Sequence, residues 1–222
     1  MLMRWGPIEH LLSGLTIPEE IYFDQLGREQ IDDVIQGLRL WYPDIVVGAE
    51  SRHLEREFYE REYSLRGSDD DRPLYGLVCR STDGGEMIGF MSLEKNVRAR
   101  QIWSPMGAVE PTKRGAGIGQ FGAVILEHVG RAIGAEVAFY QVTLKTNRQQ
   151  RNAERHGFRL CGILPGIDRD AIGPGVVRRV YEGIYVKVLA SPNEVHSPRW
   201  ADLEEPARRL WRAVFGEHPE DR

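Results

Sequence analysis

The 222-residue sequence predicts an α/β protein whose mixed β-sheet of about seven strands is covered by helices on both faces. Three observations point to this fold class. Segments with helical spacing of apolar residues alternate with strand-like segments, three consecutive hairpin-linked strands occupy the middle of the chain, and a β-α-β-α-β order follows them. With 41% hydrophobic and 28% charged residues, the composition is that of an ordinary globular protein.

The first half of the chain is expected to contain two helices and four strands. Residues 1–15 have a mixed composition and are assigned to an N-terminal extension. Aromatic and β-branched residues predict a strand over 19–26, and helical spacing of apolar residues predicts helices over 27–42 and 50–65. The hairpin-linked strands are expected over 74–81, 86–94 and 100–110. Pro105 lies inside the last of them, which requires a bulge or a point where two strands part, because proline cannot donate to a ladder.

The second half alternates helices and strands. A helix ending near Ile133 is expected after a glycine-rich segment, because apolar residues follow at intervals of three and four. The segments that come next are a strand over 135–145, a helix over 147–157, a strand over 158–164, a loop over 165–175 and a strand over 177–189. Residues 16–190 are therefore assigned to one domain, and residues 191–222 to a linker and an amphipathic C-terminal helix.

The composition argues against several classes of protein. A net charge of −4 disfavours nonspecific nucleic-acid binding, and we expect neither a signal peptide nor a membrane span. Cys79 and Cys161 lack CxxC spacing, so two reduced thiols are expected. The six histidines are scattered without HxxxH spacing, so we expect no metal site. These observations predict a cytoplasmic protein without nucleic-acid or membrane partners.

The glycine-rich segment EPTKRGAGIGQFG, residues 110–122, opens the helix that ends near Ile133, and such turns commonly bind phosphate. A P-loop is excluded, since no GxxxxGK string followed by Ser or Thr is present. The string from Gly117 to Gly122 matches the dinucleotide fingerprint GxGxxG. Its context disagrees, because PTKR separates it from the preceding strand and Glu136 lies before the next strand instead of at its end. A nicotinamide-dependent oxidoreductase is therefore a distant alternative.

A third interpretation includes the residues before the glycines, where a Val-x-Pro strand end is followed by the spacing Arg-x-x-Gly-x-Gly. The positions are filled by Val109, Pro111, Arg114, Gly117 and Gly119. This pattern resembles the acyl-CoA-binding motif of the GNAT superfamily of N-acyltransferases. The resemblance continues at Asn147 and at the string HGF of residues 156–158, and the order of elements agrees over about residues 18–190.

The resemblance implies a fold and a cofactor. In the superfamily two central strands splay apart and acyl-CoA lies in the gap, so acetyl-CoA is the expected acyl donor. Its pyrophosphate would be bound by backbone N–H groups of the loop, by the helix N-terminus and by Arg114, while strand backbone pairs with the pantetheine arm. The residues implied in binding are Ala108, Val109, Arg114, Gly115, Ala116, Gly117, Ile118, Gly119 and Asn147.

The resemblance also implies direct attack of an amine on the thioester, without a covalent enzyme intermediate. The sequence departs from the family at two groups that commonly assist this reaction. Ala153 stands where many relatives have a tyrosine acid, and Trp103 where others have a carboxylate. Tyr140 and Glu94 remain as candidate catalytic residues, with strand packing and a surface position as their alternative roles. A non-catalytic acyl-CoA-binding module on the same fold is the alternative function.

The acceptor is expected to be a small-molecule or peptide amine. In the superfamily the first two helices and the last strand pair usually shape its pocket. Four acids there suit a cationic amine and two arginines suit an acidic acceptor, so the sequence leaves both open. The acids are Asp44, Glu50, Asp168 and Asp170, and the arginines are Arg178 and Arg179. The apolar stripe of the C-terminal helix docks either on its own domain or on a second copy, and a homodimer is expected by analogy.

Overall fold

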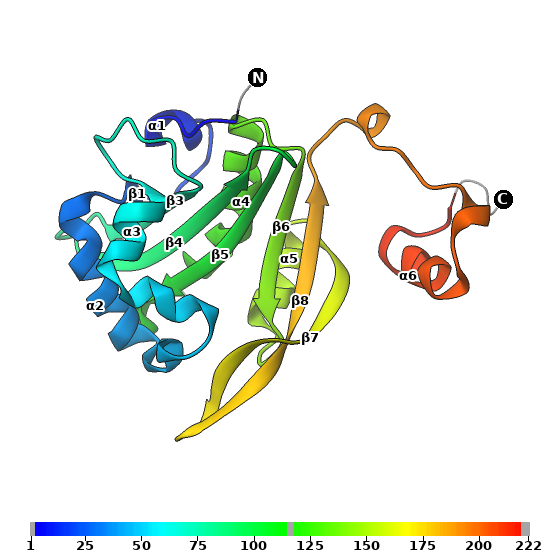
Figure 1. Cartoon of the computed structure of the whole chain (residues 1–222). Coiled ribbons are helices and arrows are strands. Elements are labelled where there is room, and N and C mark those ends of the chain that lie inside the picture. Colours follow the sequence, from blue (N-terminus) through cyan, green and yellow to red (C-terminus); the bar gives the residue numbers. More distant parts are fainter. Residues whose placement is uncertain (1–2, 115–117, 219–222) are drawn as a thin grey trace.

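The computed structural model describes residues 3–114 and 118–218, which are arranged around one mixed sheet (Figure 1). The strands lie in the order β1-β3-β4-β5-β6-β8-β7, and the short strand β2 pairs with β3. The bounds are β1 Ile21–Gln25, β2 Tyr63–Ser64, β3 Leu74–Ser81, β4 Met87–Asn96, β5 Gln101–Val109, β6 Val137–Thr143, β7 Arg159–Gly173 and β8 Val176–Val188. The pairs β5–β6 and β2–β3 are parallel and the other pairs are antiparallel. The predicted fold class is confirmed.

Helices cover both faces of the sheet, as predicted (Figure 1). The helices are α1 Ile8–Leu11, α2 Ile31–Trp41, α3 Arg56–Glu62, α4 Phe121–Ala132, α5 Arg148–Arg155 and α6 Glu205–Phe215. Buried side chains of α2 and α3 form one core with the sheet, and those of α1, α4 and α5 form another on the opposite face. We call these the α2/α3 face and the α4/α5 face. The structure also contains 3₁₀ segments, among them η2 Pro43–Val46, η3 Ala49–Leu54 and η5 Ile118–Gln120.

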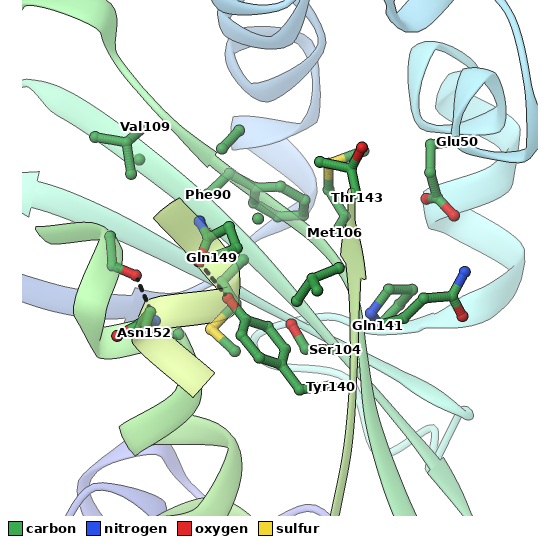
Figure 2. A pocket seen from close by; sticks show the side chains of 18 of the residues that line it. Glu50, Phe90, Ser104, Met106, Val109, Tyr140, Gln141, Thr143, Gln149 and Asn152 are labelled. Atoms are coloured by element: carbon green, nitrogen blue, oxygen red, sulfur yellow. Dashed lines mark hydrogen bonds between the residues drawn. The ribbon is translucent and has the colours of Figure 1, made fainter. Parts of the chain in front are cut away.

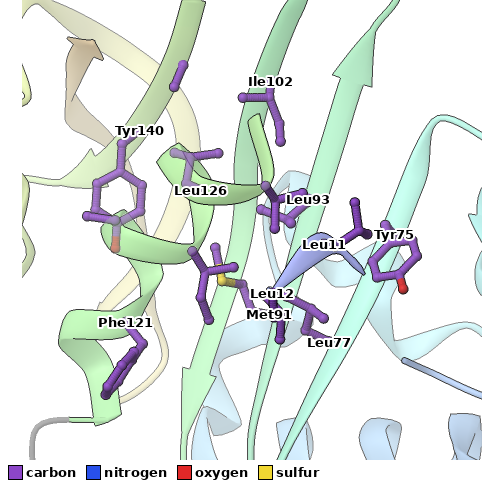
Figure 3. Close-up of a cluster of buried hydrophobic side chains, with 14 of the residues drawn as sticks. Leu11, Leu12, Tyr75, Leu77, Met91, Leu93, Ile102, Phe121, Leu126 and Tyr140 are labelled. Atoms are coloured by element: carbon purple, nitrogen blue, oxygen red, sulfur yellow. The ribbon is translucent and has the colours of Figure 1, made fainter. Parts of the chain in front are cut away.

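The core of the α4/α5 face includes the N-terminal segment (Figure 3). Leu11 of α1 and Leu12 directly after it are buried in one cluster with Leu77 and Met91 of the sheet, and Met3 belongs to the same cluster. The segment assigned to an extension therefore contributes to the core of the domain. Its helix has four residues, which is too short to produce a recognisable apolar period.

Strands β5 and β6 pair only at their beginnings. Gln101, Ile102 and Trp103 lie opposite residues 137–139, and beyond this point the strands separate. Pro105 lies just after the last β5–β6 pair. At the same place β5 bulges against β4, because two residues separate Trp103 from Met106 on β5, whereas one residue separates their partners Glu94 and Ser92 on β4. Both expected ways of accommodating Pro105 therefore occur together, a bulge and a parting of strands.

The prediction of a loop over residues 165–175 is wrong. Strands β7 and β8 continue through this region as a long hairpin that projects from the body of the molecule (Figure 1). The prolines and glycines of the segment suggested a loop, but a register shift between Leu164 and Asp168 accommodates Pro165 and Gly166 within the paired strand. The turn is limited to Pro174 and Gly175, and Gly175 has a φ of 68°.

The prediction of a single helix over residues 50–65 is also wrong. The segment contains η3, then α3, and finally strand β2, which pairs with β3. Glu55 interrupts the helix with extended backbone angles of −109° and 120°. His53 of η3 is fully buried and points into the core of the α2/α3 face, where it contacts Tyr63 of β2.

The C-terminal segment forms a linker and the helix α6, as predicted. In Figure 1, α6 lies at the end of an extended segment beside the sheet, and Arg159 of β7 donates to the Val214 carbonyl at 3.0 Å. Leu210 and Phe215 on α6 are exposed. Within the described ranges 3–114 and 118–218, no helix has the length and apolar character that crossing a membrane requires.

Candidate functional site

A cavity of about 840 Å³ opens where β5 and β6 separate (Figure 2). It is lined from both sides of the sheet, because the missing strand pairing leaves a passage between the two faces. Tyr140 and Val142 of β6 belong to the core of the α4/α5 face, so the alternating residues Gln141 and Thr143 point to the α2/α3 face. Figure 2 shows Tyr140 near Gln149 and Asn152 on one side of the cavity, and Gln141 near Glu50 on the other.

The backbone of β5 is available to a ligand at Val109. Glu110 N–H donates to the Ile88 carbonyl at 2.9 Å, so by strand alternation the backbone groups of Val109 point away from β4 and into the gap. Ala108 and Val109 were both expected to pair with pantetheine, and the backbone groups of Val109 are the ones that point into the gap. Ala108 lines the cavity, but its carbonyl lies toward β4 and its side chain is buried in the α2/α3 core.

Arg114 is fixed at the rim of the cavity. Its Nη2 donates to the Trp41 carbonyl at 2.8 Å, its Nε donates to the Val109 carbonyl at 3.0 Å, and its guanidinium lies 4.6 Å from the Tyr42 ring centre. Ile118 and Gly119 line the cavity, while Gly115, Ala116 and Gly117 fall outside the described residues. A fixed guanidinium next to the glycine loop suits a phosphate group.

Helix α5 presents Asn152 to the cavity instead of Asn147. Asn147 begins the helix without a side-chain capping bond and does not belong to the cavity lining. Asn152 is buried, and its Nδ2 donates to the Gly119 carbonyl at 3.2 Å, which ties α5 to η5. Arg148, Gln149 and Arg155 line the cavity with it. These four residues of α5 are spaced by three or four positions, so they lie on one face of the helix. This spacing is the sequence signal that could have identified them.

Tyr140 and Glu94, the candidate catalytic residues, both line the cavity. Tyr140 Oη donates to Gln149 Oε1 at 2.8 Å. Burial raises the pKa of Tyr140 to about 12, against a smaller lowering by its hydrogen bond with Asn152. Glu94 lies opposite Trp103 in the β4–β5 ladder and is half-buried. A Cβ on Gly122 would lie 3.1 Å from Tyr140 Oη, so this glycine serves the packing of α4 on β6.

Acidic side chains line the cavity at the α2/α3 face. They are Glu50 of η3, Asp168 of β7 and Glu182 of β8, together with Glu94. Burial, followed by the charges of Asp168, Glu50 and Asp170, raises the pKa of Glu182, although Gln141 donates a hydrogen bond to it. The alternative basic residues point elsewhere, because Arg178 and Arg179 are exposed and outside the lining. Asp44 is also outside it, and Asp170 pairs with Lys145.

The β7–β8 hairpin and the segment before η3 meet at the edge of this acidic region. Ala49 N–H donates to Asp168 Oδ1 at 2.9 Å. Gly48 has a φ of 86°, and a Cβ on it would come within 2.3 Å of the Arg169 carbonyl oxygen. Only glycine fits there, so two segments far apart in sequence are held together beside Glu50 and Asp168.

Neither family models nor curated protein sequences match this chain. Solved structures do match it. A mutant of the spermidine N-acetyltransferase SpeG from Vibrio cholerae gives a TM-score of 0.60 at 14% sequence identity, over 77% of this chain and 95% of that chain. The IAA acetyltransferase from Bacillus cereus ATCC 14579 gives a TM-score of 0.54 at 16% identity, over 76% of this chain and 99% of that chain. The chain has the GNAT acetyltransferase fold.

The GNAT fold is combined here with packing residues at two positions that often carry catalytic groups. Trp103 stacks on Phe139 with 4.3 Å between ring centres, across the last pair of residues before β5 and β6 part. Ala153 is fully buried on the inner face of α5. Polar residues of the cavity therefore have to come from other positions, and sequence reasoning missed Gln141, Asn152 and Glu182 among them.

Proposed function

We propose that the protein is an acyl-CoA-dependent N-acyltransferase that moves an acetyl group to an amine. The observation that carries this proposal is the cavity that opens between β5 and β6 and is lined by both basic and acidic side chains. Arg148 and Arg155 of α5 line it from the α4/α5 face, and Glu50, Asp168 and Glu182 line it from the α2/α3 face. This arrangement suits a polyanionic donor and a cationic acceptor that meet in the middle.

The chain's own residues would position the donor. Backbone groups of Val109 extend the sheet toward the pantetheine arm, and Arg114, the loop and α5 face the pyrophosphate. The acceptor nitrogen, as a free amine, attacks the thioester carbonyl carbon. The C–S bond then breaks, an amide forms, the amine proton leaves to water or a carboxylate, and the sulfur departs as a thiol. Tyr140, protonated at neutral pH, is the donor nearest to supply a hydrogen bond to the leaving sulfur.

Support for an amine acceptor comes from the carboxylates and from the neighbours. Glu50, Asp168 and Glu182 line the same part of the cavity, where burial and then the neighbouring negative charges raise the pKa of Glu182. A cation bound there would relieve the repulsion between these charges. One structurally similar protein acts on an amine by its name, since it is described as the spermidine N-acetyltransferase from Vibrio cholerae. A panel of primary amines that includes spermidine is therefore the first choice for assay.

Acetyl-CoA binding by titration calorimetry tests the donor site. Gly119→Glu introduces a carboxylate at the loop, and no atom of the described residues lies within 4 Å of the added Cβ, so the fold should tolerate it. We expect acetyl-CoA affinity to fall by at least about tenfold through repulsion of the pyrophosphate. Gly162→Glu is the matched control, because it also meets open space but lies on β7 outside the cavity. No binding to the wild type, or equal binding to both variants, contradicts the donor site.

A non-catalytic acyl-CoA-binding module remains the second candidate. It is favoured by the Trp103–Phe139 stack and by buried Ala153, which fill two positions where relatives often carry an acid or base. Acetyl-CoA binding without amine-dependent release of CoA would support this alternative.

A further inference from the structure

A chain of polar side chains runs from the acidic end of the cavity into the core of the α2/α3 face. His53 is fully buried, and its Nδ1 lies 2.9 Å from Glu50 Oε2. Its Nε2 lies 3.0 Å from Tyr63 Oη, which in turn lies 2.8 Å from Oγ of buried Ser92. The chain therefore begins at a cavity residue on η3 and ends on β4 inside the core.

The oxygens around His53 determine where its ring carries a proton. Nδ1 faces Glu50 Oε2 at 2.9 Å and the Glu50 carbonyl oxygen at 3.2 Å. A carbonyl oxygen and an ionised carboxylate only accept, so Nδ1 must donate. In the neutral ring Nε2 is then an acceptor, so Tyr63 donates to Nε2 and Ser92 donates to Tyr63. Burial raises the pKa of Tyr63, which keeps this hydroxyl protonated. All three protons point toward Glu50.

This arrangement holds one oxygen of Glu50 and presents the other. Oε2 is closed to solvent and lies 2.9 Å from His53 Nδ1, but the Nδ1 hydrogen bond goes to the Glu50 carbonyl, and Oε2 has no hydrogen-bond partner among the described residues. The Glu50 side chain as a whole is 29% exposed, so the accessible part carries Oε1 toward the cavity (Figure 2). Arg52 Nη2 lies 3.8 Å from Oε1, too far for a hydrogen bond. Oε1 therefore keeps its capacity to accept from a ligand.

The fold alone does not require a polar chain at this place. Aromatic rings of Phe58, Tyr59 and Phe90 surround His53, with ring centres 5.1 to 6.5 Å away. An apolar side chain would pack among them without needing hydrogen-bond partners, whereas buried polar groups are costly unless every one is satisfied. A fixed and ionised carboxylate in the cavity is the feature that such a chain supports.

We propose that Glu50 is the carboxylate that binds the ammonium group of the acceptor, and that His53, Tyr63 and Ser92 are positioning residues that keep it directed into the cavity. The identity of the ligand as an acceptor amine rests on the proposed N-acyltransferase function. The charged and titratable groups that face Glu50 are Arg52 and His53 from η3, Asp168 from β7, Glu182 from β8 and Tyr63 from β2.

Binding of n-pentylamine, measured by titration calorimetry, tests the proposal without depending on catalysis. Glu50→Gln should weaken this binding by about tenfold or more, because it removes a charge-assisted contact. Binding of pentan-1-ol, the uncharged counterpart, should not change. Acetyl-CoA affinity, measured in parallel, should also stay the same, since the contacts proposed for the donor come from β5, Arg114 and α5 and not from η3.

Tyr63→Phe separates positioning from packing. It removes the donor to His53, so the Glu50 side chain should be held less firmly, and n-pentylamine binding should weaken while pentan-1-ol binding stays the same. Tyr59→Phe is the matched control, because its hydroxyl is equally buried in the same aromatic cluster but donates to the His53 backbone carbonyl at 2.9 Å. If Tyr63→Phe does not fold, Ser92→Ala is used in its place, because it removes the next hydrogen bond in the series, from Ser92 to Tyr63.

Two results overturn the inference. One is amine binding that Glu50→Gln leaves intact. The other is equal n-pentylamine affinity in Tyr63→Phe and Tyr59→Phe, which would reduce the chain to a packing role. If the amine results are as expected but acetyl-CoA does not bind to the wild type, the acyltransferase proposal fails and the ammonium site stands.

Discussion

At the scale of single residues, Tyr140 is the candidate catalytic group that the structure places best for chemistry. Its hydroxyl lies in the cavity on the α4/α5 face and donates to Gln149. A pKa of about 12, raised mainly by burial, keeps the phenol protonated at neutral pH. A protonated phenol cannot act as a base, so its useful role is to donate to negative charge that develops on the thioester.

Replacement of this hydroxyl gives a direct prediction. Tyr140→Phe should lower kcat by about 10²-fold while acetyl-CoA affinity stays nearly unchanged, because the lost hydrogen bond acts in the transition state. The matched control is Tyr185→Phe, since Tyr185 lies directly opposite Tyr140 on β8 and donates to Glu154 at 3.2 Å, outside the cavity. Steady-state kinetics with a saturating amine would compare the two. An equal loss in both variants would show that Tyr140 only packs the sheet.

The residues of the site differ in how far the sequence could reveal them. Val109 and Arg114 were identifiable because a short motif fixes their positions relative to the glycines. Asn147 was the expected amide on α5, but the rotation of that helix on the sheet brings Asn152 into the cavity instead. Helix rotation depends on tertiary packing, which no local pattern encodes. Glu182 was missed because its role depends on Gln141 and Asp168, which come from other strands.

At the scale of elements, the contact between Gly48 and the β7–β8 hairpin gives the acidic end of the cavity its shape. Gly48→Ala should destabilise the protein by about 1–3 kcal/mol, from backbone strain at positive φ and from the clash with the Arg169 carbonyl. Gly84→Ala is the control, with a φ of 82° but no described atom within 4 Å of its Cβ. Denaturant unfolding measures both. Equal losses would mean that the interelement contact contributes nothing.

The elements also show which patterns predict structure from sequence. Strands β3 to β6 and helices α2 and α4 were predicted from their apolar patterns and turn signals, and α5 from the Asn147 cap and the Gly157 stop that flank it. Residues 159–164 and most of β8 were predicted as strands, but residues 165–175 were read as a loop because Pro165, Gly166 and Gly173 are loop-forming residues. Bulges accommodate them in a paired strand, and that outcome depends on the partner strand. The segment 50–65 was read as one helix because its pairing with β3 is a long-range contact.

At the scale of the whole molecule, the parting of β5 and β6 opens a cavity that reaches both faces of the sheet. Arg148 and Arg155 of α5 line it from one face, Arg114 is bound to the end of α2 on the other face, and four carboxylates line it together with Arg52. The net charge of −4 therefore conceals clusters of basic and acidic side chains around the cavity. Such clusters would orient two substrates with their reacting atoms in the gap, which supplies much of what a direct transfer needs.

Amine-dependent release of CoA tests this account most directly. Purified full-length protein would be mixed with acetyl-CoA and each member of a primary-amine panel, and free thiol would be followed with a chromogenic disulfide reagent. We predict release that depends on both substrates, saturates with the amine, and falls together with acetyl-CoA binding in Gly119→Glu but not in Gly162→Glu. Tight acetyl-CoA binding with no release of thiol for any cationic amine would contradict the proposed acyl transfer.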